Sequence, residues 1–234
     1  MLVQGYRCGD CWCAKGSGEC PRWQPANYSD SFVQQISKQQ PINPYNLSCD
    51  PYKDSGCETD PPQPTNFTDE TVCAHHFSPT CDNYTLVSHP SLESANEAGG
   101  IVTHYGRCGT CSTRQDLAVY MNIFDMVGPG KSCSVIGFFS EKRGIKCFEK
   151  LGLTRPCAAT WMYNAFNSSK KCFGTCIINF FNPWYNGPVP HCKLNTCINC
   201  DEEESGPLFK LFAGRSCRGS GLANAITRPC DTVR

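Results

Sequence analysis

The segment His104-Tyr-Gly-Arg-Cys108-Gly-Thr-Cys111-Ser-Thr-Arg-Gln-Asp116-Leu-Ala-Val-Tyr120 carries the densest group of reactive side chains in the chain. Ser112 precedes Gln115 by three residues, which is the spacing of a capping box at the start of a helix. Apolar side chains then recur at i, i+3, i+4 and i+7, and this period predicts a helix over residues 112–125. Cys108 and Cys111 would therefore lie at a helix N-terminus, where the helix dipole stabilises a thiolate.

Cysteine content sets the class of protein. The chain has 234 residues, of which 20 are cysteines, whereas only 18% are charged. A reduced cytosolic protein rarely carries so many cysteines without repeated metal-binding spacings, and the three CxxC pairs here lie far apart in the sequence. We therefore expect a secreted, disulfide-bonded protein from which a signal peptide has been removed.

Two further features limit the partners. The formal net charge is zero, so nucleic acid is not an expected partner, and no apolar run is long enough to span a membrane. Five Asn-x-Ser/Thr sequons predict an N-glycosylated protein. The sequons are at Asn27, Asn46, Asn66, Asn83 and Asn167.

Helix signals predict a mainly α, disulfide-rich fold with short helices, extensive coil and little strand. Residues 1–100 are expected to form a loop-rich, disulfide-stapled layer and residues 101–234 a helical core, unless the two make one continuous domain. Helices are expected over 31–40 with Ser31 as cap, 112–125, 142–151, from Thr154 onward, 171–180, 194–204 and 205–214, with a last turn after Ser220. A strand is expected at 85–88, and a buried strand or turn at 134–139.

Several blocks resemble an uncharacterised family of secreted cysteine-rich proteins from algae, other microbial eukaryotes and marine invertebrates. The resembling blocks are His104-Tyr-Gly-x-Cys108-Gly-x-Cys111-Ser…Gln115-Asp-Leu-Ala-Val-Tyr120 and Cys200-Asp-Glu-Glu-x-Ser-Gly-Pro207-x-Phe-Lys210. This resemblance implies a class of protein and no particular activity. A weaker resemblance, to secreted luciferases of marine worms, implies an oxygen-using reaction on a small organic molecule.

Polar residues in these two blocks give the main functional hypothesis, a secreted enzyme that acts on a small organic substrate and is plausibly an oxidoreductase. The candidate catalytic residues are His104 as acid/base, together with Asp116, Asp201, Lys210 and Arg215. The candidate substrate-binding residues are Tyr105, Tyr120, Trp184 and Tyr185. No cofactor is predicted.

Two other functions remain open. In the first, the chain is an extracellular binding or structural module, and the same polar groups are helix caps and ion pairs. In the second, Cys108 and Cys111 form a redox-active pair of a thiol–disulfide oxidoreductase. No metal site is predicted, because adjacent His75 and His76 point apart in a strand and the other histidines are scattered.

Overall fold

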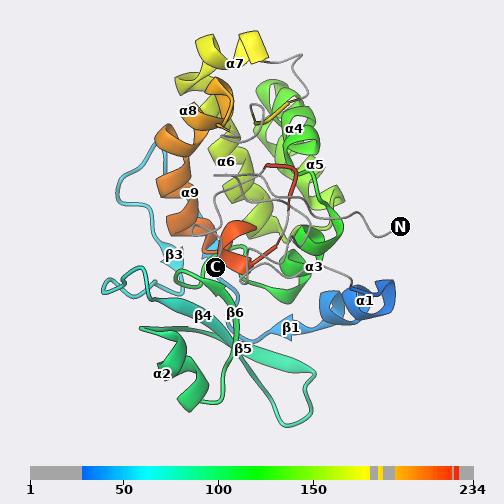
Figure 1. The fold of residues 1–234 in the computed structure, drawn as a ribbon, viewed down its shortest axis with the longest axis vertical. Coiled ribbons are helices and arrows are strands. Elements are labelled where there is room, and N and C mark those ends of the chain that lie inside the picture. The colour runs from blue at the N-terminus through cyan, green and yellow to red at the C-terminus, as the bar shows by residue number, and fades with distance from the viewer. Residues whose placement is uncertain (1–27, 180–183, 187–192, 223, 227–234) are drawn as a thin grey trace.

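The computed structural model describes residues 28–179, 184–186, 193–222 and 224–226. A small β-sheet with one covering helix lies at one end of the molecule, and a group of helices forms the other end (Figure 1). The fold is mainly α and rich in disulfides, as the sequence predicts. Residues 1–27 of the expected N-terminal layer lie outside the described residues. No helix in the described part of the chain is long and apolar enough to cross a membrane.

The described strands all precede residue 106, and most of the described helices follow it. The helices are α1 (Asp30–Lys38), α2 (Leu92–Glu97), α3 (Arg114–Asn122), α4 (Val127–Phe139), α5 (Glu141–Lys150), α6 (Arg155–Lys171), α7 (Phe173–Asn179), α8 (Thr196–Glu204), α9 (Gly206–Ala213) and the 3₁₀ helix η1 (Arg218–Ser220). The strands are β1 (Gln40–Pro41), β2 (Asn46–Leu47), β3 (Thr59–Asp60), β4 (Val72–Phe77), β5 (Asn83–His89) and β6 (Ile101–Tyr105).

The main sheet has the strand order β1-β5-β4-β6. β4 pairs antiparallel with β5 and β6, and the short β1 pairs parallel with β5. One face packs against α2 through Val72 and Ala95, whereas Tyr84 and Leu86 form a buried cluster on the other face. The predicted strand at 85–88 is part of β5. Since β6 follows residue 100 and pairs with β4, a boundary after residue 100 would divide this sheet.

A backbone junction joins the sheet to the helices. Residues 107–112, which follow β6, lie against residues 212–215, which include the last two residues of α9. The Thr110 N–H donates to the Phe212 carbonyl and the Cys111 N–H donates to the Ala213 carbonyl, each over 2.9 Å. A side chain at Gly109 would place its Cβ 2.4 Å from the Phe212 carbonyl oxygen, so only glycine permits this approach.

Disulfides reinforce the junction from both sides. Cys108 bonds to Cys73 in the sheet, and Cys111 bonds to Cys157 in α6. The remaining disulfides among the described residues are Cys49–Cys57, Cys133–Cys147, Cys172–Cys200 and Cys176–Cys197. Cys108 and Cys111, the redox pair of the alternative hypothesis, are therefore not bonded to each other, because each sulfur reaches a distant partner.

Several helix ends follow their local signals. Thr154 is the N-cap of α6, Asn195 caps α8 by accepting from the Ile198 N–H, and Gly214 ends α9 with φ of 73°. The expected caps differ by one or two residues elsewhere, since Ser29 caps α1 and Thr113 caps α3. Helical turns after Ser220 were also expected, but the 3₁₀ helix η1 ends at that residue.

The prediction of a strand or turn at 134–139 is wrong, because these residues form the second half of α4. A short apolar run carries no period that separates a strand from a buried helix. The Gly128-Pro-Gly130 stretch lies in the first turn of α4. Asp125 caps this turn by accepting from the Val127 and Gly128 N–H groups, and proline is tolerated in a first turn.

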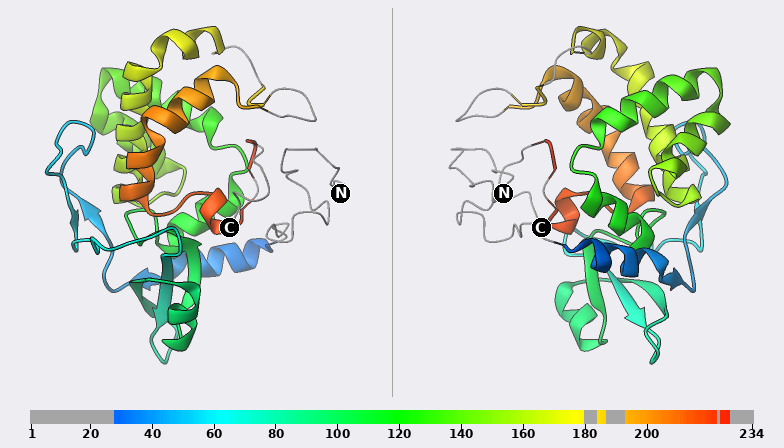
Figure 2. Two further views of the ribbon diagram at one scale, coloured as in Figure 1. Left: turned by 60° about the vertical axis from the view of Figure 1, so that its left-hand side comes forward. Right: turned by 90° about the vertical axis from the view of Figure 1, so that its right-hand side faces the viewer.

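The helical core forms where α4, α5 and α6 meet. At Gly144 of α5, an added Cβ would lie 2.7 Å from the Gly137 Cα of α4 and 2.4 Å from the Met162 sulfur of α6. Both glycines therefore permit the close packing of these helices. α1 packs separately, with Val33 and Ile36 against Ala118 of α3. Figure 2 shows α1 lying where the helical end meets the sheet.

We expect the disulfide at the junction to stabilise the protein more than a short-range one. Replacing Cys111 and Cys157 by alanine, 46 residues apart, removes about 4 kcal/mol of chain-entropy stabilisation. The same change at Cys49 and Cys57, 8 residues apart, removes about 2.5 kcal/mol. Urea unfolding of both double variants measures the two losses, and equal losses would contradict this account.

Candidate functional site

His104 on β6 is a buried, fully hydrogen-bonded side chain. Its Nδ1 lies 3.0 Å from the Tyr105 carbonyl oxygen, which can only accept, so Nδ1 carries the hydrogen. Its Nε2 therefore accepts from the Ser112 hydroxyl over 2.7 Å, and Ser112 in turn accepts from the Gly109 N–H over 2.8 Å. Burial and the Arg215 charge hold the pKa of His104 well below its ordinary value, so the imidazole is neutral.

Arg215 is buried beside this histidine and holds the junction. Its guanidinium donates to the carbonyl oxygens of Cys111 and Thr103, each over 3.0 Å. It also donates to the Ser220 hydroxyl over 3.0 Å and to the Thr103 hydroxyl. Burial lowers the pKa of Arg215 to about 10, which still leaves it charged at neutral pH. Its contacts are those of a structural cross-link.

Asp116 joins the starts of two helices. Its carboxylate accepts from the hydroxyl of Thr113, the N-cap of α3, over 2.5 Å. It also accepts from the N–H of Thr154, the N-cap of α6, over 2.8 Å, and from the Thr154 hydroxyl over 2.9 Å. Burial raises the pKa of Asp116 to about 6, although these hydrogen bonds oppose the shift.

These positions show where the structure places three members of the predicted catalytic group. The 104–120 and 201–215 blocks do meet, but they meet through backbone hydrogen bonds and buried side chains at the junction. His104, Asp116 and Arg215 all lie outside the lining of the cavity described below. Tyr105 packs against the cluster beneath α2 and is also outside that lining.

A mainly apolar cavity of about 410 Å³ lies among α3, α4, α6, α7, α8 and α9. Its apolar lining includes Val135, Phe138, Trp161, Phe173, Ile177 and Phe209. Of the predicted site residues, Tyr120, Asp201 and Lys210 line this cavity. Tyr120 is buried, and its hydroxyl accepts from the Trp161 indole N–H over 3.0 Å.

The two aromatic residues predicted to contact a ligand from a loop lie beside this cavity. Trp184 is 72% exposed and Tyr185 donates its hydroxyl to Asp125 over 2.8 Å, and neither ring belongs to the lining. Asp125 does line the cavity, as does Lys131, whose ammonium lies 6.0 Å from the centre of the Tyr185 ring.

One wall of the cavity is polar. There, Ser168 of α6 donates to the Asp201 carboxylate of α8, and the Asn164 amide donates to the same oxygen over 3.4 Å. The Tyr52 hydroxyl donates to the Asn164 amide oxygen over 2.9 Å. Burial, with the nearby Asp201 charge, raises the pKa of Tyr52, so this phenol stays a donor. The wall therefore presents a carboxylate, an amide and a hydroxyl to an otherwise apolar space.

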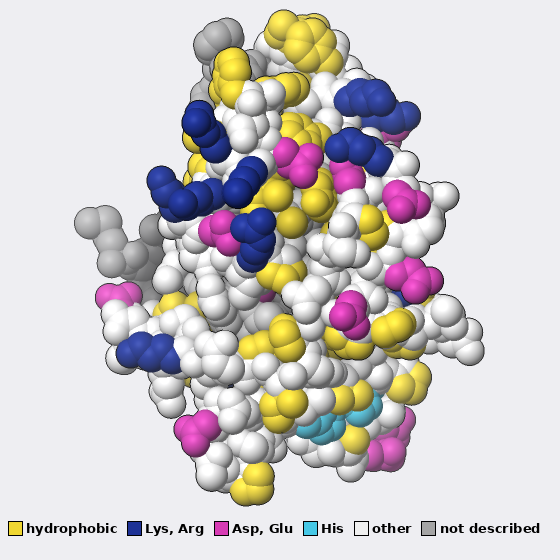
Figure 3. Space-filling view, turned by 180° about the vertical axis from the view of Figure 1, so that it is seen from behind, with side chains coloured by type: hydrophobic (Ala, Val, Ile, Leu, Met, Phe, Trp, Pro, Cys, Tyr) yellow, Lys and Arg dark blue, Asp and Glu magenta, His cyan; other side chains and the backbone are white. Residues whose placement is uncertain are grey.

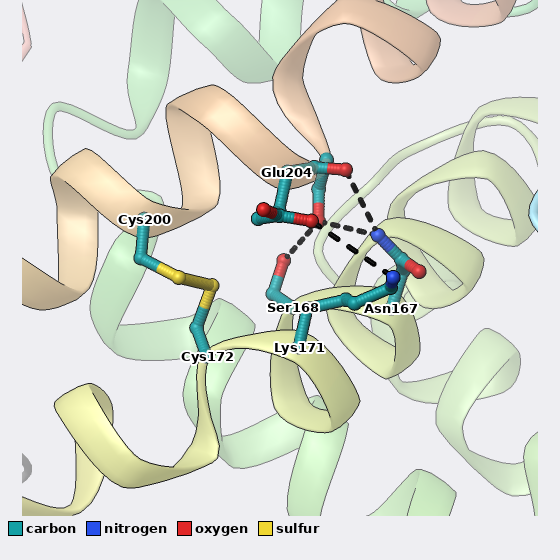
Figure 4. Close-up of polar contacts among 7 residues, drawn as sticks. Asn167, Ser168, Lys171, Cys172, Cys200 and Glu204 are labelled. Carbon is teal, nitrogen blue, oxygen red and sulfur yellow. Dashed lines mark hydrogen bonds and ion pairs between the residues drawn. A yellow bond between two sulfur atoms is a disulfide. The ribbon is translucent and has the colours of Figure 1, made fainter.

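Contacts behind this wall fix α6 against α8 and α9 (Figure 4). The Asn167 amide donates to the Glu204 carbonyl over 3.1 Å and to the Ser205 hydroxyl over 2.9 Å. The disulfide Cys172–Cys200 joins the end of α6 to α8. Since Asn167 precedes Ser168 directly, these contacts set the position of the Ser168 hydroxyl.

Residues 141–234 match the model of a family of unknown function (DUF8771). The matched segment begins at α5 and includes the polar wall, but α3 and α4 precede it. No curated protein and no solved structure matches the chain.

Sequence reasoning missed most of the cavity. Trp161 of α6, for example, was not among the predicted site residues, and its half-buried ring packs against the core cluster as well as lining the cavity. Asn164 and Ser168 gave a usable signal, because they are four residues apart in a helix and so share one face. The cavity-lining residues of α4 gave no such signal, since residues 134–139 were expected in a strand or turn.

Stability should fall when the pH is lowered from 7 to 5. The unfolded chain protonates His75 and His104 below pH 6.5, whereas burial lowers their folded-state pKa values, to about 3 for His75. Each histidine then contributes a loss of about 1.4 kcal/mol per pH unit. Asp116 offsets the loss from one histidine. Its folded-state pKa is raised to about 6, so as the pH falls the folded protein binds this proton before the unfolded chain does.

Urea unfolding at pH 7, 6 and 5 measures the net dependence. His75, His104 and Asp116 together give a loss of about 1.4 kcal/mol per pH unit below pH 6, and His89 adds to this loss because burial lowers its pKa too. The variant Asp116→Asn removes the opposing contribution, so its slope should be steeper by about 1.4 kcal/mol per pH unit. A free energy of unfolding that stays constant or rises between pH 7 and 5 would contradict the buried, neutral state of these histidines.

Proposed function

We propose that this protein is an extracellular, disulfide-stabilised binding protein whose cavity takes a small, mainly apolar organic molecule that carries a polar group. The observation that supports this proposal is an apolar cavity bounded on one side by the Asn164–Ser168–Asp201 wall. Small-molecule sites are typically cavities of about 300–1,000 Å³ with apolar linings and a few convergent polar groups. This cavity, of about 410 Å³, fits that description.

The division of the lining suggests how such a ligand would lie. Aromatic and aliphatic side chains would bury its apolar part, at about 25 cal/mol for each Å² removed from water. Its polar group would face the amide and carboxylate wall, where an unpaired polar group would cost binding energy. Because the wall is held by a disulfide and backbone contacts, little ordering accompanies binding.

An apolar surface surrounds the opening of the cavity. Phe138, Phe173 and Ile177 line the cavity and are also 65%, 64% and 56% exposed. They belong to α4 and α7 at the end of the molecule remote from the sheet, where Figure 3 shows hydrophobic side chains at the surface. An apolar ligand would therefore meet apolar side chains before it reaches the interior.

Binding is favoured over the enzyme hypothesis by the positions of the predicted residues. The expected acid/base, His104, is neutral, buried and hydrogen-bonded on both nitrogens. Among the predicted catalytic residues, Asp201 and Lys210 line the cavity. The oxidoreductase and luciferase-like hypotheses have support from resemblance alone, and the redox-pair hypothesis loses its geometry because Cys108 and Cys111 have other partners.

An extracellular location is supported by composition and cross-linking. The described residues contain six disulfides, which persist mainly in oxidising compartments. The resemblance to secreted cysteine-rich proteins agrees with this location.

Filling the cavity should weaken ligand binding. Ala165 lines the cavity from α6, so the variant Ala165→Trp places a large ring in the space that a ligand would occupy. We expect an uncharged, environment-sensitive fluorescent probe to bind the native protein, and the variant to bind it at least about tenfold more weakly, a loss of about 1.4 kcal/mol. Fluorescence titration measures both.

Ala98→Trp is the matched control, because Ala98 is exposed at the end of α2 and distant from the cavity lining. A second variant, Phe138→Ser, removes apolar lining without adding volume. Circular dichroism and thermal unfolding identify any variant that fails to fold. Equal probe affinity in the native protein, folded Ala165→Trp and folded Phe138→Ser would overturn the proposal.

The sequons differ in how accessible their amide nitrogens are. Asn46, Asn66 and Asn83 are exposed, whereas Asn27 lies outside the described residues. Asn167 is half-buried in α6, and its amide nitrogen donates two of the contacts drawn in Figure 4, to the Glu204 carbonyl and the Ser205 hydroxyl. Attachment of a glycan leaves this nitrogen with one hydrogen, so at least one of these bonds would be lost.

We therefore predict glycans at Asn66 and Asn83 and none at Asn167 when the protein is made in a glycosylating host. Mass spectrometry of tryptic glycopeptides measures the occupancy of each site. Substitution of Thr68 or Thr85 by alanine serves as a control, because it removes the sequon and leaves the asparagine. Full occupancy at Asn167 in folded protein would show that the α6–α8 contacts are dispensable.

A further inference from the structure

Two helices place large apolar side chains at the surface of one end of the molecule. Phe139 of α4 and Ile178 of α7 are 86% and 80% exposed, and neither side chain lines the cavity. Phe138, Phe173 and Ile177 are exposed at the cavity opening between these two helices. In Figure 1, α7 lies at the end of the long axis that is remote from the sheet. A contiguous exposed apolar surface typically marks a contact with a partner or a membrane.

Basic residues accompany these apolar side chains. Residues 127–179, from the start of α4 to the end of α7, contain eight Lys or Arg and two Glu, which is a net charge of +6 in a chain whose net charge is zero. Lys142 and Arg143 closely follow the end of α4, Lys170 precedes α7, and all three are exposed. Figure 3 shows Lys and Arg side chains beside the hydrophobic ones at this end of the molecule.

Most of the nearby acidic groups are paired within the protein. The ion pairs are Lys53–Glu141 (3.8 Å), Lys171–Glu204 (4.0 Å) and Arg218–Glu202 (3.7 Å). Asp201 belongs to the polar wall of the cavity. Within the described ranges, no acidic side chain forms an ion pair with Lys142, Arg143 or Lys170. Their charges are therefore available to an anionic partner.

We propose that this end of the molecule, comprising the exposed apolar side chains of α4 and α7 and the basic residues beside them, binds the surface of a membrane that contains anionic phospholipids. Phe139 and Ile178 would enter the boundary between the headgroups and the acyl chains. Lys142, Arg143 and Lys170 would contact the anionic headgroups. This combination of apolar insertion and electrostatic attraction is how peripheral proteins bind a bilayer without spanning it.

A second copy of the chain fits this end less well than a bilayer does. A twofold contact uses the same surface on both copies, so it would bring the two sets of basic residues together. Like charges that face each other across an interface oppose association. An anionic bilayer instead offers negative charge at its surface and apolar chains beneath it, which matches both kinds of side chain on the protein.

The cavity opens at the same end of the molecule, between α4 and α7. A small apolar ligand dissolved in the bilayer would therefore have a short path into the protein. Membrane binding does not rest on ligand binding, however, because Phe139 and Ile178 lie outside the cavity lining. The two proposals can therefore be tested separately.

The experiment measures binding of the intact protein to unilamellar vesicles by co-sedimentation. One set of vesicles is pure phosphatidylcholine, and the other contains about 30% phosphatidylserine. The native protein should bind the anionic vesicles at least about tenfold more tightly than the neutral ones. Raising the salt concentration should weaken this binding, because salt screens the attraction between exposed charges.

The double variant Phe139→Ser/Ile178→Ser should bind anionic vesicles at least about tenfold more weakly, because it removes the inserted apolar side chains. Leu92→Ser/Ile101→Ser is the matched control, since both residues are exposed at the sheet end, and it should bind as the native protein does. Thermal unfolding checks that each variant is folded. Without vesicles, Phe139→Ser/Ile178→Ser should bind the fluorescent probe as the native protein does, which separates a failure at the membrane from a failure at the cavity.

Lys170→Gln should weaken binding to anionic vesicles about fivefold, the effect expected of one basic residue near a charged bilayer. Lys38→Gln, which removes an exposed charge at the end of α1, should have no effect. Absence of binding to anionic vesicles, equal affinity for both kinds of vesicle, or native affinity in folded Phe139→Ser/Ile178→Ser would overturn the proposal. Sedimentation equilibrium of the protein alone provides another check, because a dimer that this double variant dissociates would assign the surface to a second copy and overturn it too.

Discussion

A buried arginine holds the sheet and the helices of this protein together. Arg215 donates to carbonyl oxygens on both sides of the junction, at Thr103 in β6 and at Cys111 before α3. A buried guanidinium is costly unless its donors are satisfied, so these carbonyl and hydroxyl contacts offset its desolvation. The same charge helps keep His104 and His75 neutral, which lets them act as hydrogen-bonding groups in the interior. The polar groups of the junction therefore depend on one another.

The two cysteines of the Cys108-x-x-Cys111 motif link this junction covalently to the rest of the molecule. Cys108 extends it into the sheet through Cys73, and Cys111 extends it into α6 through Cys157. Since α6 supplies Asn164 and Ser168, the covalent link to Cys157 also anchors the helix that bears the polar wall of the cavity. Reactive residue types at a helix start thus serve here to hold three parts of the chain in one arrangement.

The sequence predicts those features that depend on neighbouring residues, and it misses those that depend on contacts between distant residues. Caps and glycine stops are local, so the starts of α6 and α8 and the end of α9 were predicted correctly at Thr154, Asn195 and Gly214. Burial, in contrast, depends on contacts between residues that are far apart in the sequence. His104 and Ser112 are residue types that are common in reactive sites, and only their contacts with residues near Arg215 show that both side chains lie in the interior. Every helix from α3 to α9 contributes to the cavity lining, and no single stretch of sequence records that combination.

The segment that matches the family model supplies only part of the cavity lining. The matched segment, residues 141–234, contains Asn164, Ser168, Asp201 and Lys210, whereas the apolar wall on α4 precedes it. The matched segment also supplies apolar lining residues, among them Trp161 and Phe209. The α4 wall, with its exposed Phe138, is where the size and shape of a ligand's apolar part would be set in this chain. In the proposed function, the matched segment would therefore contact both the polar group and part of the apolar body of a ligand, and α4 would contact the rest of the apolar body.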